Sequence, residues 1–151
     1  MRHWWLSGVV IASWVVATSP AAFAACSVTT PPEGWAVSSL RWDGDCASGV
    51  ANGLGVLKEQ QGTTVLRSFF GRVEKGELLI GVIDTPDQGY SAGRFAQGRV
   101  QASDERQVLI DAFDAAAQAA GAAAERFAQA GNGASAQFYR SKAQALREQL
   151  D

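Results

Sequence analysis

The chain has 151 residues and a formal net charge of −2 at neutral pH, with 47% hydrophobic and 19% charged residues. Acidic and basic residues are interspersed without a basic run, which excludes the clustered positive surface that nucleic-acid binding requires. The single histidine is His3. The rest of the chain therefore has neither a Ser-His-Asp triad nor a histidine-based zinc site, and the sequence predicts no cofactor and no metal.

Residues 1–24 have the three parts of a cleavable secretory signal peptide. Arg2 supplies a positive start, and an apolar run extends from Trp4 to Ala17. Ala22-Phe23-Ala24 then matches the small-x-small pattern that signal peptidase cleaves. We expect cleavage after Ala24 and a periplasmic or secreted mature protein.

The two cysteines are Cys26 and Cys46. In an exported chain, an even pair of cysteines is typical of a disulfide, and this bridge would stabilise the fold by about 3 kcal/mol. Two alternatives stay open for the pair: free thiols, or a lipoprotein in which Cys26 is lipidated. A further alternative for residues 1–24 is an uncleaved membrane anchor.

Residues 25–39 predict an extended arm, because Pro31-Pro32 forbids a helix there. Residues 40–102 alternate short β-branched and aromatic segments with glycine-rich turn signals, which is typical of an antiparallel β-meander. The predicted strands are Ser39–Cys46, Gly53–Leu57, Thr63–Val73 and Glu77–Ile83. The predicted turns are 47–52, 58–62, 74–76 and 84–89.

Three segments of the meander share one pattern: glycine, any residue, an apolar residue, two further residues and a second glycine. They are Gly44–Gly49, Gly71–Gly76 and Gly93–Gly98, and each is preceded by an aromatic residue, at Trp42, Phe69 and Tyr90. The second glycine suits a hairpin turn with positive φ. The first suits a strand position that a ring or a neighbouring backbone approaches closely.

The first copy continues with Gly53-x-Gly55-x-Leu57, and this arrangement resembles the MORN repeat family. Phe69–Gly81 resembles a partial second copy that lacks the closing G-x-G, and Tyr90–Val100 resembles a degenerate third copy. Whether the third copy forms a hairpin or a linker stays open. The resemblance implies a flat antiparallel β-meander that serves as a scaffold or binding surface, and it implies no reaction.

Residues 103–151 predict an α-helical hairpin. Ser103 or Asp104 would cap the first helix, with acidic residues in its first turn, and Gly131-Asn132-Gly133 would end it. A second helix would then run from Ser135 to Leu150. The predicted apolar face of the first helix contains Leu109, Phe113, Ala116, Ala120, Ala123 and Phe127, and that of the second contains Tyr139, Ala143, Leu146 and Leu150. The expected fold class is therefore α+β.

The sequence contains no recognisable catalytic motif. A serine nucleophile would need a lysine partner, and no Ser-x-x-Lys motif links Ser68, Ser91 or Ser103 to Lys58, Lys75 or Lys142. Four acidic residues in or beside turns are ordinary turn formers, and an acid-pair enzyme is the alternative that they leave open: Asp43, Asp45, Asp84 and Asp87.

The candidate binding surface consists of aromatic and apolar side chains of the arm, the meander and the first helix: Trp35, Trp42, Phe69, Tyr90, Phe95, Leu109, Phe113 and Phe127. Burial of these side chains in the core is the competing interpretation, with Trp35 and Tyr90 expected to be partly exposed. We predict a non-enzymatic exported binding or scaffold module that engages a protein partner, or a second copy in a homodimer, through its sheet face or its helices. The alternative is an envelope protein that binds glycan or phospholipid through exposed aromatics.

Overall fold

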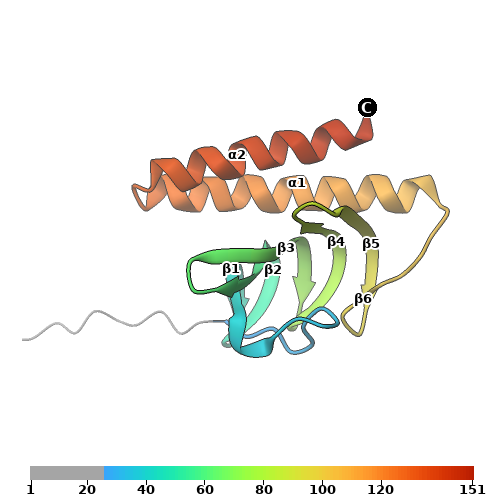
Figure 1. The fold of residues 1–151 in the computed structure, drawn as a ribbon, viewed down its shortest axis with the longest axis horizontal. Coiled ribbons are helices and arrows are strands. Elements are labelled where there is room, and N and C mark those ends of the chain that lie inside the picture. Colours follow the sequence, from blue (N-terminus) through green and yellow to red (C-terminus); the bar gives the residue numbers. More distant parts are fainter. Residues whose placement is uncertain (1–25) are drawn as a thin grey trace, which may run out of the picture.

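The computed structural model describes residues 26–151, so the expected signal peptide and its cleavage after Ala24 lie outside the described residues. Six antiparallel strands follow one another in a sheet in chain order, and two helices come after them (Figure 1). This arrangement confirms the predicted α+β fold class. None of the helices in the described part is long and apolar enough to cross a membrane.

The strands are β1 Leu40–Ala47, β2 Val50–Gln61, β3 Thr64–Glu74, β4 Glu77–Thr85, β5 Gly89–Ala96 and β6 Arg99–Val100. The helices are α1 Arg106–Gln129 and α2 Gly133–Arg147, with short 3-10 helices η1 Val37–Ser39 and η2 Glu148–Leu150. Two predicted turns, 47–52 and 58–62, were placed wrongly. Ser48-Gly49 alone turns the chain at the first, and β2 continues through Gln61 at the second.

Three two-residue turns close hairpins at one end of the sheet: Ser48-Gly49, Lys75-Gly76 and Gln97-Gly98. All six residues have positive φ, between 49° and 81°. Positive φ at both positions is the type I′ geometry, whose twist matches that of the flanking strands. The third turn joins β5 to β6, so the third copy of the sequence pattern forms a short hairpin.

A row of glycines crosses the sheet in register, one from each of the first five strands: Gly44, Gly55, Gly71, Gly81 and Gly93. The rings of Trp42 and Phe69 lie against this row. A Cβ atom at Gly55 would lie 2.5 Å from the Trp42 ring, and one at Gly71 would lie 2.7 Å from the Phe69 ring. The missing side chains therefore let two large rings lie against the backbone of the sheet.

The arm runs across the three type I′ turns and joins them. The backbone N–H groups of Ser27, Thr29 and Glu33 donate to the carbonyls of Gly49, Gly76 and Gly98, at 3.0, 2.9 and 3.0 Å. The predicted disulfide between Cys26 and Cys46 is present and ties the start of the arm to β1, with the two Cα atoms 6.0 Å apart.

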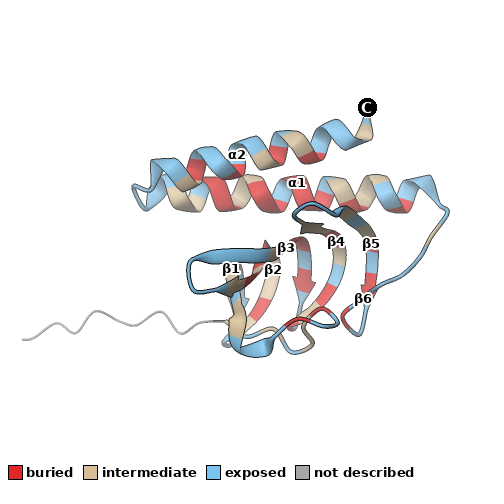
Figure 2. Ribbon diagram, viewed as in Figure 1, coloured by how far each residue is buried: buried red, intermediate tan, exposed pale blue. Residues whose placement is uncertain are grey.

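The sheet has an apolar core on each face (Figure 2). On one face, Val56, Phe70 and Val82 pack against the alanines of α1, and α2 packs on the far side of α1. On the other face, the arm brings Trp35 onto a cluster that also contains Leu57, Phe69, Val73, Leu78 and Phe95. Because α1 is covered on both sides, alanines that are almost fully buried let the sheet and α2 approach it closely.

The helix boundaries differ from those expected in two places. The N-cap of α1 is Glu105, not Ser103 or Asp104, and no acidic residue lies in the first turn. The Ser103 hydroxyl instead accepts from the Glu105 N–H at 3.1 Å, before the helix begins. The second helix starts two residues earlier than predicted, because the Asn132 side chain caps it by accepting from the Ser135 N–H at 3.0 Å.

The glycine row predicts a large cost for Gly71→Ala. Its Cβ would lie 2.7 Å from the Phe69 ring and 2.8 Å from the Gly81 Cα, and the sheet backbone cannot move aside. We expect a loss of about 3 kcal/mol in the free energy of unfolding, measured in urea. Gly121→Ala in α1 is the control. Its Cβ would enter open space, so it should be neutral or add up to about 1 kcal/mol. Equal effects of the two substitutions would refute this role of the row.

The disulfide predicts a redox dependence of stability. Its two cysteines are 20 residues apart in the sequence. Reduction, or Cys46→Ser, should lower the free energy of unfolding by about 3 kcal/mol. Thermal unfolding with and without reductant measures this, and Cys46→Ser should show no further response to reductant. A wild-type melting temperature that does not change on reduction would contradict the prediction.

Candidate binding groove

A half-open groove of about 480 Å³ lies between the β2–β3 hairpin, the β4–β5 turn and the middle of α2. Its lining comes from segments far apart in the sequence: Val65, Arg67 and Ser68 of β3, Asp84 of β4, Pro86 and Asp87 of the turn, and Phe138 and Lys142 of α2. Apolar surface and charged groups are therefore present in the same hollow, which is typical of a site that binds and orients a ligand.

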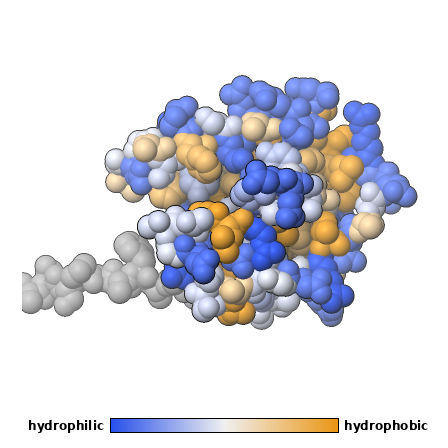
Figure 3. Space-filling model, viewed as in Figure 1, coloured by the Kyte–Doolittle hydropathy of each residue, from blue (hydrophilic) through white to orange (hydrophobic). Residues whose placement is uncertain are grey.

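The hairpin forms one wall because β2 and β3 are longer than their neighbours. β1 pairs with β2 as far as Glu59, and β4 pairs with β3 from Ser68 onwards, so residues 60–66 extend beyond the sheet. Val65 on this extension is 39% exposed, and Phe138 on α2 is 57% exposed. Figure 3 shows hydrophobic surface between the sheet and the helical layer in this view. An apolar group that enters the groove would remove both side chains from water.

An ion pair joins α2 to the sheet inside the groove. Lys142 Nζ lies 2.8 Å from Asp84 Oδ2 and 5.9 Å from the centre of the Tyr90 ring. Partial burial alone would lower the pKa of Lys142, but the hydrogen bond and charge of Asp84, helped by Tyr90, outweigh burial and raise this pKa. Lys142 therefore stays protonated, and a protonated lysine cannot act as general base for Ser68.

A second ion pair links the groove to the arm. Arg67 Nε donates to Glu59 Oε2 at 2.6 Å, and the Ala36 N–H donates to Glu59 Oε1 at 2.9 Å. Arg67 also donates to the Gly34 carbonyl and lies 5.1 Å from the centre of the Trp35 ring. The hydrogen bond from Arg67 lowers the pKa of Glu59, burial opposes this, and the Ala36 N–H adds to the lowering. This carboxylate, 4% exposed, is thus ionised at neutral pH and holds the arm.

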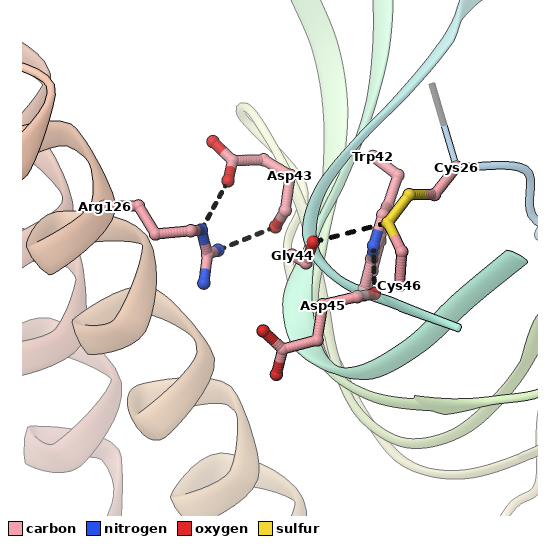
Figure 4. Close-up of polar contacts among 7 residues, drawn as sticks. All are labelled: Cys26, Trp42, Asp43, Gly44, Asp45, Cys46 and Arg126. Carbon is pink, nitrogen blue, oxygen red and sulfur yellow. Dashed lines mark hydrogen bonds and ion pairs between the residues drawn. A yellow bond between two sulfur atoms is a disulfide. The ribbon is translucent and has the colours of Figure 1, made fainter. Parts of the chain in front are cut away.

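Side chains join edge strand β1 to α1 and to the arm (Figure 4). Arg126 of α1 donates to Asp43 Oδ1 at 2.8 Å and to the Asp43 carbonyl at 2.9 Å. The Trp42 indole N–H donates to the Asp45 carbonyl at 3.0 Å. Arg126 therefore ties β1 to α1, and the disulfide between Cys26 and Cys46 ties β1 to the arm.

The structure divides the predicted binding surface between two cores. Trp35, Phe69 and Phe95 are buried beneath the arm, and Trp42 packs against the same cluster, partly buried. Tyr90, Phe113 and Phe127 are half-buried between sheet and helices, and Leu109 is 39% exposed. The expectation that Trp35 is partly exposed was wrong: its exposure is 7%, because the arm folds back and Arg67 covers the ring.

The four acidic turn residues lie in two places. Asp43 pairs with Arg126, and Asp45 is exposed beside Gly53. Asp84 and Asp87 both line the groove, but the Asp84 carboxylate already forms an ion pair with Lys142. An acid–base pair would need both carboxylates, so this ion pair competes with such a role. Within residues 26–151, no group of three or more metal-ligating side chains is close enough to hold an ion.

Sequence reasoning missed Phe138, the most exposed aromatic side chain among the large hydrophobic residues of the described part. The signal was present, because Phe138 precedes Tyr139, the first residue of the predicted buried face of α2. Tyr139 is 5% exposed and stacks on Phe127 with ring centres 5.3 Å apart. Adjacent helical residues point about 100° apart, so Phe138 cannot share that buried face.

Comparison with protein-family models, with curated proteins and with solved structures finds no match to this chain. The resemblance to the MORN repeat family thus stays a prediction from the motifs. The disulfide supports a non-cytoplasmic location, because cytoplasmic reductants keep such thiols reduced.

The buried Glu59 predicts an acid-sensitive arm. Because its folded pKa lies below the ordinary value of 4.5, Glu59 contributes stability above that value and loses it as pH falls through the folded pKa. Glu59→Gln should lower the free energy of unfolding by about 2 kcal/mol at neutral pH. It should also reduce the fall in this free energy as the pH is lowered. Urea unfolding in steps down to about pH 3 measures both effects.

Glu33→Gln is the matched control. Glu33 also pairs with an arginine, Arg99, at 2.6 Å, but both side chains are more than 60% exposed. This variant should change the free energy of unfolding by less than about 0.5 kcal/mol. If the free energy of unfolding of Glu59→Gln changed with pH in parallel with that of the wild type, Glu59 would not be the source of the acid sensitivity.

Proposed function

We propose that the chain is a non-enzymatic, exported binding module that engages a protein partner through the groove between the β2–β3 hairpin and α2. The observation that carries this proposal is the pair of exposed apolar side chains, Phe138 and Val65, in one groove with charged side chains. Exposed aromatics in a pocket with a polar rim are the usual energetic centres of protein interfaces.

The burial of both sheet faces favours the groove, and not a face of the sheet, as the binding site. One face of the sheet is covered by α1 and the other by the arm, so the aromatics of the meander are engaged inside the protein. The helices take part through α2, which supplies Phe138 and Lys142. Export is supported by the disulfide and by the signal-peptide pattern of residues 1–24.

A glycan is the second candidate ligand, because an exposed aromatic ring and several polar side chains line the same groove. An exposed ring beside Ser68, Asp84 and Asp87 could stack on a sugar and bind its hydroxyls. Trp35 reports on the groove, because Arg67 lines the groove and also lies over the Trp35 ring. Tryptophan fluorescence that responds to murein fragments in the wild type, but not in Phe138→Ala, would favour the glycan.

Phe138→Ala tests the proposal with little risk to folding, because its side chain is more than half exposed. Loss of an aromatic anchor should weaken partner binding about thirtyfold. The measurement is a crosslinked pull-down of the tagged protein from its own cell envelope, with the captured proteins identified and quantified by mass spectrometry.

The matched control is Leu109→Ala, an exposed apolar residue of α1 outside the groove. A partner that is retained by this variant and lost by Phe138→Ala would support the groove. A partner captured equally by both variants would place the interface elsewhere. Capture of a second copy alone, sensitive to Phe138→Ala, would make the groove a homodimer contact.

A further inference from the structure

The charges of the groove are paired within the protein, with one exception. Arg67 is held by Glu59 and the Gly34 carbonyl, and Lys142 is held by Asp84. Asp87 lines the same groove with an exposed side chain, and within residues 26–151 no hydrogen bond or ion pair reaches its carboxylate. The groove therefore offers a ligand one unbalanced negative charge beside its apolar surface.

The backbone fixes the position of Asp87. It lies in the three-residue turn between β4 and β5, with φ of 65°, directly after Pro86. The Gln88 N–H donates to the Thr85 carbonyl at 3.0 Å and closes the turn. Aspartate tolerates this left-handed conformation better than most side chains. Asp87 thus has a defined backbone conformation, and its exposed side chain lines the groove.

We propose that the groove recognises a short segment of a protein partner that carries an apolar or aromatic side chain next to a lysine or arginine. The apolar side chain packs against Phe138 and Val65, and the cation pairs with Asp87. This inference rests on the proposed function and names the chemistry of the partner.

Size and charge favour a short cationic segment. The groove volume, about 480 Å³, lies in the lower part of the range for ligand pockets, roughly 300–1,000 Å³, and suits one or two side chains better than a folded surface. An anionic segment would meet Asp87 with no unpaired cation to offset it.

The experiment pans a phage library of random peptides against the tagged, disulfide-bonded protein. Enriched peptides should carry a lysine or arginine at a fixed spacing from an apolar or aromatic residue. Synthetic copies of them should bind about thirtyfold more weakly to Phe138→Ala. They should bind about threefold more weakly to Asp87→Asn and to Asp87→Gly, and this difference should shrink as salt is added.

Asparagine and glycine both adopt the φ of Asp87, so the two variants remove the charge and keep the turn. The matched control is Asp104→Asn, which removes an exposed charge outside the groove and should leave binding unchanged. Enrichment without a basic bias, or a basic bias that survives in both Asp87 variants, would overturn the inference. Failure to enrich any peptide would overturn it as well.

The two proposals fail separately. If the envelope partner depends on Phe138 but the peptides show no basic preference, the protein-binding function stands and the inference about the cation falls. If the partner is captured equally by Phe138→Ala, the groove itself is excluded, whatever the library yields.

Discussion

The fold depends on the arm reaching across the turns of the meander. A sheet made from hairpins has two apolar faces, and the helices can cover only one of them. The arm covers the other, because three of its N–H groups bind the carbonyls of Gly49, Gly76 and Gly98. Each such hydrogen bond contributes about 1 kcal/mol net, and the burial of Trp35 beneath them adds a few more. The same turn glycines that reverse the chain thus also receive the arm.

The rings that lie on the sheet impose a second constraint. Trp42 and Phe69 can lie against the strands only because glycines stand in register on neighbouring strands, and a single Cβ in that row would meet a ring or a backbone atom. The opposite face has no such row. There the strands present Val56, Phe70 and Val82, and α1 accommodates them by using alanine at its contacts. Small residues therefore lie in the sheet on one face and in the helix on the other.

Features that depend on a few neighbouring residues could be predicted from the sequence, whereas most contacts between distant segments could not. The turns at Lys75-Gly76 and Gly131 were predictable, because a residue with positive φ is a local requirement that glycine meets. The disulfide was predictable from compartment and number of cysteines. The burial of Trp35 was not, because it depends on Glu59 and Arg67, which lie more than twenty residues along the chain. The extension of β2 to Gln61 was also missed, since Lys58–Gln61 has the polar composition of a turn.

That polar extension is what makes the candidate groove. If β2 and β3 ended with their neighbours, Val65 would not lie beyond the sheet and α2 would have no facing wall. Arg67 then connects the wall to the arm, because one guanidinium binds Glu59, the Gly34 carbonyl and the face of Trp35. Lys142 makes the corresponding connection from α2 to Asp84. Arg67 and Lys142 therefore join the two walls of the groove to the arm and to the sheet, so the shape of the groove depends on ion pairs between segments far apart in the sequence.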